Sequence, residues 1–164
     1  MAADVQNFRE AMARLCAAVN IVTTAGAAGR CGLTATAFCP VTDTPPTVMI
    51  CINRNSATNA IFKENARLCV NILDETHEAH ARHFAGLTDI PMAERFDTSE
   101  WAEDESGVPR LRQALASLSG RLKDVFEIGT HSVLVAEIDE IVLSGGGSGL
   151  VYFGRRFASV ALAS

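Results

Sequence analysis

The chain has 164 residues, of which 48% are hydrophobic, and it carries a formal charge of −5 with an isoelectric point near 5.3. This length predicts one domain over residues 1–164, large enough to bury roughly 70% of the surface that its unfolded form exposes. Scattered basic residues argue against nucleic acid or a membrane surface as partner, and no run of about 18 apolar residues could span a bilayer.

The N-terminal residues and the cysteines indicate where the protein works. Residues 1–15 carry acidic side chains where a secretory signal would carry a basic patch and an apolar run, so we expect a cytoplasmic protein. None of the five cysteines belongs to a CxxC pair, which is typical of buried thiols in a reducing compartment. Cys31 follows Arg30 and is therefore a weak candidate for a nucleophile.

The first elements along the chain are a helix and a hairpin. Asp4 is a suitable N-cap, and Phe8, Met12 and Leu15 recur at helical spacing, so we expect one face of a helix ending near Cys16 to pack against a core. A β-branched run and a second apolar run flank a glycine-rich turn, which predicts a hairpin over residues 18–38.

The middle of the chain alternates strands and helices. After a turn at Pro45-Pro46, the almost continuously apolar residues 47–53 predict a strand buried on both faces. Ser56 predicts a helix over residues 57–65, and residues 67–73 predict the next strand. A second helix should cover residues 76–84. The irregular segment that follows predicts a long excursion over a site or partner, with a short helix over residues 92–96.

The last third of the chain is predicted to be β-structure. Two long strands within residues 115–143 meet at Gly129-Thr130, and residues 150–153 form a last short strand. Six or so strands with helices between them predict a mainly β fold, a barrel with α-helical decoration.

Three motifs that might suggest other chemistry are set aside. The SGGGSG run at Ser144–Gly149 lacks the G-x-G-x-x-G spacing and follows no βαβ pattern, so we interpret it as a turn. His77, His80 and His83 lack an acidic or cysteine partner, and we expect no metal there. The acids from Glu103 to Glu105 are interpreted as a solvated loop.

Small and amide-bearing residues gather at the ends of the predicted strands. They suit a flat heterocycle with a polar edge, such as a flavin ring, because amides and hydroxyls pair with the edge while bare backbone N–H groups approach the ring. Ser56 and Thr58 at a helix N-terminus favour a phosphate, although a capped turn alone is the other interpretation. The residues are Thr34, Ala35, Thr36, Asn53, Asn55, Ser56, Thr58 and Asn71.

Several blocks in register resemble one protein family over nearly the whole chain. The blocks are GLTATAF, VTDTPPTVMICINRNSATN, LCVNIL, ARHFAG, ERF, IGTH and GLVYFGRRF. Their order and spacing are similar to those of the short-chain flavin reductases. Within that family the blocks most resemble the group that serves aromatic monooxygenases of the 4-hydroxyphenylacetate type. A closely related group of the same family serves monooxygenases of pyrimidine utilisation.

The resemblance implies a fold and an activity. It implies a single-domain, six-stranded antiparallel split β-barrel that binds FMN, a homodimer, and hydride transfer from NADH or NADPH to FMN or FAD. The reduced flavin would then diffuse to a separate oxygenase component.

The resemblance also implies a set of site residues. The backbone and hydroxyl groups of residues 34–37 would line the flavin ring, and His131 would lie where the nicotinamide stacks. Because the sequence has no separate dinucleotide-binding motif, we expect the donor to be held partly by the flavin and partly by a loop over residues 84–96, which begins at Phe84 and would close over the site. Ala37 belongs to the segment that lines the ring, and the remaining cofactor-binding residues are Asn53, Asn55, Ser56, Thr58, Asn71, Ile72, Tyr152, Arg155 and Arg156.

One residue departs from the family pattern, and two other functions stay open. Pro40 stands where a freer residue is expected, which leaves the path of the chain after residue 38 undetermined. A barrel that keeps its flavin and acts as an oxidase or electron carrier would present similar residues. So would a non-catalytic barrel used for dimerisation or effector sensing.

Overall fold

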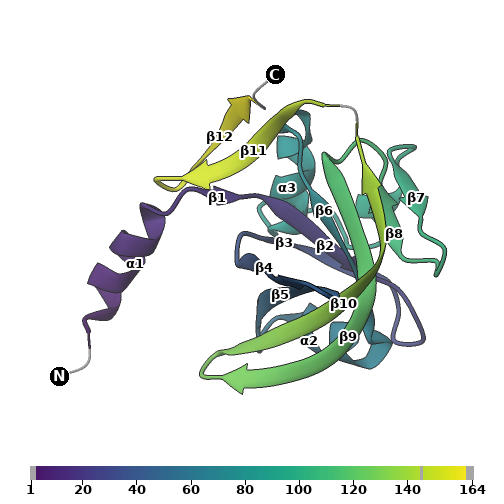
Figure 1. The fold of residues 1–164 in the computed structure, drawn as a ribbon. Helices are drawn as coiled ribbons and strands as arrows, with labels where there is room; N and C mark the ends of the chain where they lie inside the picture. Colours follow the sequence, from purple (N-terminus) through teal and green to yellow (C-terminus); the bar gives the residue numbers. More distant parts are fainter. Residues whose placement is uncertain (1–2, 145, 162–164) are drawn as a thin grey trace.

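The computed structural model describes residues 3–144 and 146–161, and a curved sheet forms the body of the molecule (Figure 1). The strands are Ala17–Ala18 (β1), Asn20–Thr24 (β2), Cys31–Ala35 (β3), Phe38–Asp43 (β4), Pro46–Asn53 (β5), Arg67–Ile72 (β6), Trp101–Glu103 (β7), Pro109–Leu111 (β8), Ala116–Ile128 (β9), His131–Leu143 (β10), Ser148–Phe153 (β11) and Arg156–Ala161 (β12). The helices are Val5–Ala13 (α1), Ala57–Asn65 (α2) and Glu78–Phe84 (α3), with 3₁₀ turns at Glu75–His77 (η1) and Glu94–Phe96 (η2).

The main sheet closes on itself through two linking residues. Its seven strands pair antiparallel in the order β3-β2-β6-β9-β10-β5-β4. The edge strands β3 and β4 are consecutive in the chain, so Thr36 and Ala37 connect one edge to the other. The N–H of Cys51 in β5 donates to the carbonyl of Ala37 over 3.0 Å, which extends the pairing into this link. The split barrel is confirmed, with seven strands in the sheet instead of six.

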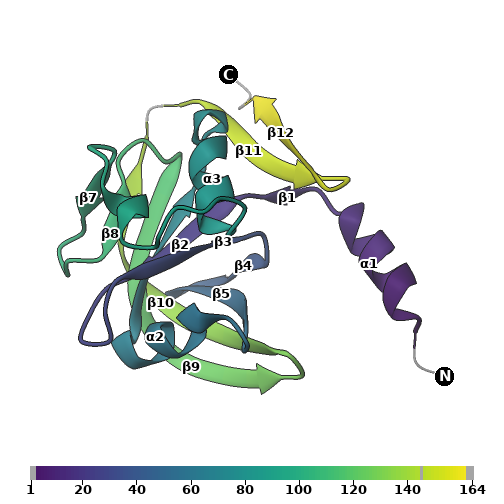
Figure 2. The same ribbon diagram turned by 180° about the vertical axis from the view of Figure 1, so that it is seen from behind.

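The long hairpin of β9 and β10 gives the barrel its curvature. Each strand has 13 residues, and the two wrap around one side of the molecule (Figures 1 and 2). Their register shifts after Val135 and again after Ile138. At Gly120 a Cβ would come within 2.2 Å of the Glu137 carbonyl oxygen, so only glycine fits there. Such bulges bend a strand and increase its twist.

Two clusters of buried side chains stabilise the fold by removing apolar surface from water. One fills the barrel and is built around Phe62, Ile50, Leu68 and Leu134. The other packs between the barrel, α3 and the excursion, and includes Ile21, Leu73, Phe84, Phe96, Trp101 and Leu111. Phe84, Phe96 and Trp101 meet edge to face with ring centroids 5.1–5.5 Å apart. This second cluster anchors the excursion beside α3.

Most predicted elements are confirmed. Asp4 caps α1 by accepting from the N–H of Asn7 over 2.7 Å, and α2 begins directly after Ser56. The hairpin of β2 and β3, strand β6 and the β9–β10 pair also occur where they were predicted. The second predicted helix is a 3₁₀ turn followed by α3. Within the described residues, no helix combines the length and apolar character needed to cross a bilayer.

The predicted packing of the first helix is wrong. Phe8, Met12 and Leu15 are 59%, 48% and 61% exposed, and α1 contains no buried residue. Figures 1 and 2 show α1 projecting away from the barrel. The helix carries the predicted apolar stripe, but this stripe does not pack against the core that the described residues form.

The predicted burial of β5 on both faces is also wrong. Val48, Ile50 and Ile52 are buried, whereas Met49 and Cys51 are only half-buried. The strand is apolar on both faces, but only the face that carries Val48, Ile50 and Ile52 contributes to the core cluster inside the barrel.

Further elements of the fold were not predicted. The first is strand β4, which shows the path that the chain takes after residue 38. Pro40 lies in this edge strand beside a register shift, where a missing ladder N–H is tolerated. The hairpin of β7 and β8 lies within the excursion, and β12 pairs with β11. Gly145, in the predicted glycine-rich turn, lies outside the described residues.

Candidate functional site

The link between the two sheet edges forms one wall of a cavity of about 360 Å³. Ala35 is buried, but Thr36 and Ala37 are exposed and carry small side chains. The N–H of Phe38 donates to the carbonyl of Thr36 over 2.9 Å, which tightens the turn. The lining residues are Leu33, Thr34, Ala35, Thr36, Ala37, Cys51, Ile52, Asn53, Ser56, Phe84, Ala85 and His131.

The N-terminus of α2 reaches the same cavity through Ser56. Ser56 Oγ accepts from the N–H of Thr58 at 3.4 Å and lies 2.8 Å from Thr58 Oγ1. Asn53 Oδ1 accepts from the N–H of Asn55 over 2.9 Å and so shapes the loop before the helix. Asn55 and Thr58 do not line the cavity, and Thr58 is buried. The positive end of the helix dipole lies beside the Ser56 wall.

His131 forms a further part of the wall. It begins β10 and stands directly opposite Asn53 of β5 in the antiparallel register. The side chain is exposed, and its Nδ1 lies 2.9 Å from Thr130 Oγ1. The hairpin turn at Gly129-Thr130 therefore brings an imidazole next to the loop that precedes α2.

Helix α3 supplies the remaining wall because Gly32 allows its close approach. A Cβ on Gly32 would meet the Phe84 ring at 2.9 Å. Thr34 Oγ1 donates to the carbonyl of Ala81 over 2.6 Å, so this hydroxyl proton ties β3 to α3. The hydroxyl proton of Thr34 is therefore already used within the protein.

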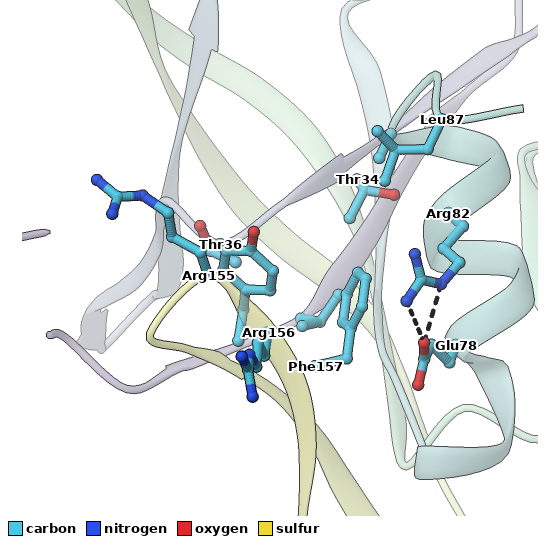
Figure 3. A pocket seen from close by; sticks show the side chains of 11 residues that line it. Thr34, Thr36, Glu78, Arg82, Leu87, Arg155, Arg156 and Phe157 are labelled. Atoms are coloured by element: carbon cyan, nitrogen blue, oxygen red, sulfur yellow. Dashed lines mark hydrogen bonds and ion pairs between the residues drawn. The ribbon is translucent and has the colours of Figure 1, made fainter. Parts of the chain in front are cut away.

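A second cavity, of about 680 Å³, adjoins the first and shares Thr34, Thr36 and Ala85 with it. Figure 3 shows its basic side chains, Arg82, Arg155 and Arg156, arranged around Thr36 and Phe157. Arg82 pairs with Glu78 over 2.7 Å, and its guanidinium lies 5.0 Å from the centre of the Phe157 ring. The other lining residues are Val19, Leu87 and Tyr152.

Arg155 holds the β11–β12 turn against α1. Gly154 and Arg155 both have positive φ, 57° and 63°, as a two-residue hairpin turn of this hand requires. Arg155 donates to both carboxylate oxygens of Glu10, over 2.8 and 3.2 Å. This pairing lowers the pKa of Glu10 and raises that of Arg155.

A third cavity, of about 580 Å³, lies between α1 and the same link. Phe8, Met12 and Leu15 line it together with Thr36 and Ala37. Thr36 borders all three cavities, so the short link between the sheet edges is their common wall.

Asn71 and Ile72 line none of these three cavities. Asn71 is fully buried, and its Oδ1 accepts from the N–H of Leu111 over 2.8 Å and from Ser117 Oγ over 3.0 Å. Its Nδ2 donates to the carbonyl of Ile21 over 3.0 Å. The amide of Asn71 is committed to joining β2, β8 and β9, and the structure does not bring it to the site.

The structure corrects two interpretations of the motifs that were set aside: His80 has an acidic partner, Glu100, and Asp104 of the acidic loop is buried instead of solvated. His80 pairs with Glu100 over 3.1 Å and His83 with Thr88 over 3.0 Å, while burial lowers the pKa of His77. Burial also raises the pKa of the Cys31 thiol to about 11, so that this thiol stays protonated at neutral pH.

Sequence reasoning missed several lining residues. Arg82 and Ala85 stand inside the ARHFAG block and could have been found there, because neighbouring Phe84 was. Cys51 and Phe157 carry no local signal, since strand pairing and the β11–β12 hairpin bring them to the cavities.

Known proteins resemble this chain over most of its length. The family model described as a flavin reductase like domain matches residues 12–161. The 4-hydroxyphenylacetate 3-monooxygenase reductase component of Pseudomonas aeruginosa is 59% identical over 152 residues, which cover 93% of this chain and 89% of that protein. The FMN reductase (NADH) RutF of an Enterobacter species is 47% identical over 154 residues, which cover 94% and 93%.

A solved structure shows the same fold. The NADH:FAD oxidoreductase SgcE6 of Streptomyces globisporus C-1027, in complex with NAD and FAD fragments, superposes with a TM-score of 0.87 at 27% identity. The superposition covers 96% of this chain and 93% of that one.

Proposed function

The chain belongs to the flavin reductase like family, and on this premise we propose that it transfers hydride from NADH to FMN or FAD and releases the reduced flavin to a separate oxygenase. The observation that carries the proposal is the cavity walled by Thr34–Ala37, Ser56 and His131. It combines a bare strand link, a helix N-terminus and an imidazole on three sides of one space.

The residues present fit a flavin. A planar ring needs a wall without bulky side chains, and Ala35, Thr36 and Ala37 provide one. Because β3 pairs only with β2, alternate backbone groups on its other side are free to meet the polar edge of the ring. An anionic tail is favoured at the capped N-terminus of α2.

Each group then has a proposed role. Residues 34–37 hold the ring, while Asn53, Asn55, Ser56 and Thr58 hold the ribityl chain and phosphate. When bound, the flavin supplies the hydride-accepting chemistry, and the protein supplies alignment and electrostatics. His131 orients the nicotinamide on the open side of the cavity. Backbone N–H groups of the link stabilise negative charge at the polar edge.

The donor is proposed to lie in the second cavity. Arg156 and Tyr152 line it, and a guanidinium suits a diphosphate. Phe84, Ala85 and Leu87 border the two cavities at the start of the loop over residues 84–96, which supports closure of this loop over the donor. NADH is the proposed donor because two relatives are described as NADH-dependent.

The partner is proposed to be an aromatic monooxygenase of the 4-hydroxyphenylacetate type. Identity to a reductase component of such a system is 59%, against 47% to RutF, and this difference favours the first over a pyrimidine-utilisation enzyme. The five free thiols support a cytoplasmic location, and we retain one domain over residues 1–164 as part of the proposal.

A homodimer is also part of the proposal, and α1 supports it. A nine-residue helix with no buried residue gains little stability alone in water. Its exposed side chains Val5, Phe8 and Met12, together with Leu15 just beyond its end, form an apolar face that a second copy could cover.

A steady-state assay tests the function. NADH and NADPH are each combined with riboflavin, FMN and FAD, and we expect donor oxidation with flavin in excess over protein. Flavin that remains bound through gel filtration and is reduced only once would instead identify an oxidase or electron carrier. No donor oxidation with any flavin would favour a non-catalytic barrel.

A further inference from the structure

Behind the loop that precedes α2, one carboxylate gathers several partners. Glu127 of β9 accepts from Lys63 Nζ over 2.5 Å and from Ser132 Oγ over 2.9 Å. Arg54 Nε lies 3.1 Å from Glu127 Oε2. Ser132 is fully buried and also accepts from Asn59 Nδ2 over 3.1 Å, so the carboxylate connects β9, β10, α2 and the loop.

Arg54 lies in the loop directly before the N-terminus of α2. It lies between Asn53 and Asn55, two residues before the Ser56 cap. Its backbone N–H donates to the carbonyl of Thr130 over 2.9 Å, next to His131. This backbone contact holds the loop in place whether or not residue 127 carries a charge.

The charge on residue 127 sets the net positive charge of this group of side chains beside α2. The side chains of Arg54, Lys63 and Glu127 are 53%, 31% and 41% exposed, so the three charges act through solvent and within a Debye length of about 8 Å. With the carboxylate the three side chains carry one net positive charge. With a neutral side chain at position 127 they would carry two.

We propose that Glu127 limits the affinity of the chain for phosphorylated flavins, because its carboxylate lies against Arg54, which stands two residues before the Ser56 cap of α2, while its other cation, Lys63, lies in the last turn of that helix. This inference rests on the proposed function, since it requires a flavin phosphate at that end of the helix. A reductase that passes its flavin to another protein must release it, and a weakened phosphate contact favours release.

Glu127→Gln tests the role of the charge, because glutamine keeps the size and an acceptor for Lys63 and Ser132. Dissociation constants for FMN and riboflavin are measured by flavin fluorescence, without donor. We expect about threefold to tenfold tighter FMN binding, as a charge interaction in partly screened solvent gives. Riboflavin, which has no phosphate, should change less than twofold. The FMN gain should shrink as salt is raised.

Asp139→Asn is the matched control. Asp139 also holds two cations, Arg67 at 2.9 Å and Arg121 at 3.4 Å. It lies seven residues beyond Ser132 along β10, roughly 20 Å from that serine and farther than Glu127 from the N-terminus of α2. We expect no change for either flavin in this variant, although it alters the net charge equally.

A second variant keeps the proposal testable if the first folds poorly. Arg54→Gln with Glu127 intact should weaken FMN binding by about the factor that Glu127→Gln gains, because the exposed charges act additively through solvent, and the double variant should return close to the wild-type affinity. Unchanged or weaker FMN binding in Glu127→Gln, an equal change for riboflavin, or a double variant that keeps the full gain would overturn the inference while leaving the proposed function intact. Failure of the wild-type protein to bind either flavin would overturn both.

Discussion

The carbonyl oxygen of Ala37 accepts a hydrogen bond from the N–H of Cys51 over 3.0 Å, and both residues line the cavity. The contact that closes the barrel therefore also builds the proposed flavin site. Closing a sheet removes its exposed edges, but at this link only small side chains cover the backbone. The link that joins the two edges of the sheet is therefore also the wall of the cavity proposed to hold the flavin.

Ala37→Leu tests whether this link must stay bare. Ala37 is exposed, so a larger side chain should leave the free energy of unfolding nearly unchanged while filling part of the cavity. We expect flavin affinity to fall at least about tenfold, since a clash with a ring costs more than about 1.4 kcal/mol. The control is Ala79→Leu on the exposed face of α3. Undiminished flavin affinity in Ala37→Leu would contradict the proposed ring position.

Asn71→Leu tests the distinction between a core residue and a site residue. The change leaves the Leu111 N–H, the Ser117 hydroxyl and the Ile21 carbonyl without their partner. We expect the free energy of unfolding in urea to fall by about 3–5 kcal/mol, with flavin affinity of the folded protein unchanged. The exposed Asn55→Ala should cost less than about 0.5 kcal/mol. A selective loss of flavin binding in Asn71→Leu would restore the site interpretation.

Phe8→Glu tests the proposed dimer. A carboxylate in the middle of the apolar face of α1 should disfavour association, because charges are depleted in the cores of protein interfaces. Light scattering after gel filtration should report half the mass of the wild-type protein. Gln6→Lys, about half a turn around the helix, should remain dimeric. A wild-type protein that is monomeric at micromolar concentration would exclude this role for α1.

The elements predicted best are those with a local chemical signal. Ser56 marks the start of α2, and Gly129-Thr130 marks the bend between β9 and β10, because caps and tight turns depend on the residues at those positions. The packing of Phe8 could not be predicted in this way. An apolar stripe indicates that something covers it, but not whether that surface belongs to the same chain.

The site could be predicted where it is continuous in sequence and not where pairing assembles it. The segment Thr34–Ala37 and the loop at Asn53–Ser56 were found as blocks, and the segment lines the cavity together with Asn53 and Ser56 of the loop, whereas Asn55 does not. Asn71 looked the same as Asn53, because each is an amide at the end of a strand. The pairing of β6 with β9 and the packing of β8 turn the amide of Asn71 into the core.

The buried thiols predict a loss of stability at alkaline pH. Burial raises the pKa of Cys31 to about 11 and that of Cys69 to about 12, above the value near 9 of an unfolded thiol. The folded state therefore keeps these protons longer than the unfolded state does. The stabilisation is complete below about pH 9 and is lost as the pH rises through the folded pKa values.

The measurement is urea unfolding at pH 8, 9 and 10, with Cys31→Ala for comparison. We expect stability to fall over this range and to fall less steeply in the variant. Iodoacetamide at pH 8 should modify the exposed Cys16 and Cys39 before Cys31 and Cys69. Rapid modification of Cys31 in the folded protein would revive it as a nucleophile.

His131→Ala separates donor binding from flavin binding. His131 stands at the cavity wall opposite Asn53, with its Nδ1 engaged by Thr130 Oγ1, so its other ring nitrogen is free for the nicotinamide amide. Loss of one such hydrogen bond should lower kcat or raise KM for NADH about tenfold. The dissociation constant for flavin should change less than twofold, because the link and the α2 terminus hold the flavin. His83→Ala, which removes an imidazole from α3, is the control. Steady-state kinetics of His131→Ala equal to those of the wild type would exclude the role, because the side chain would then contribute only to the turn.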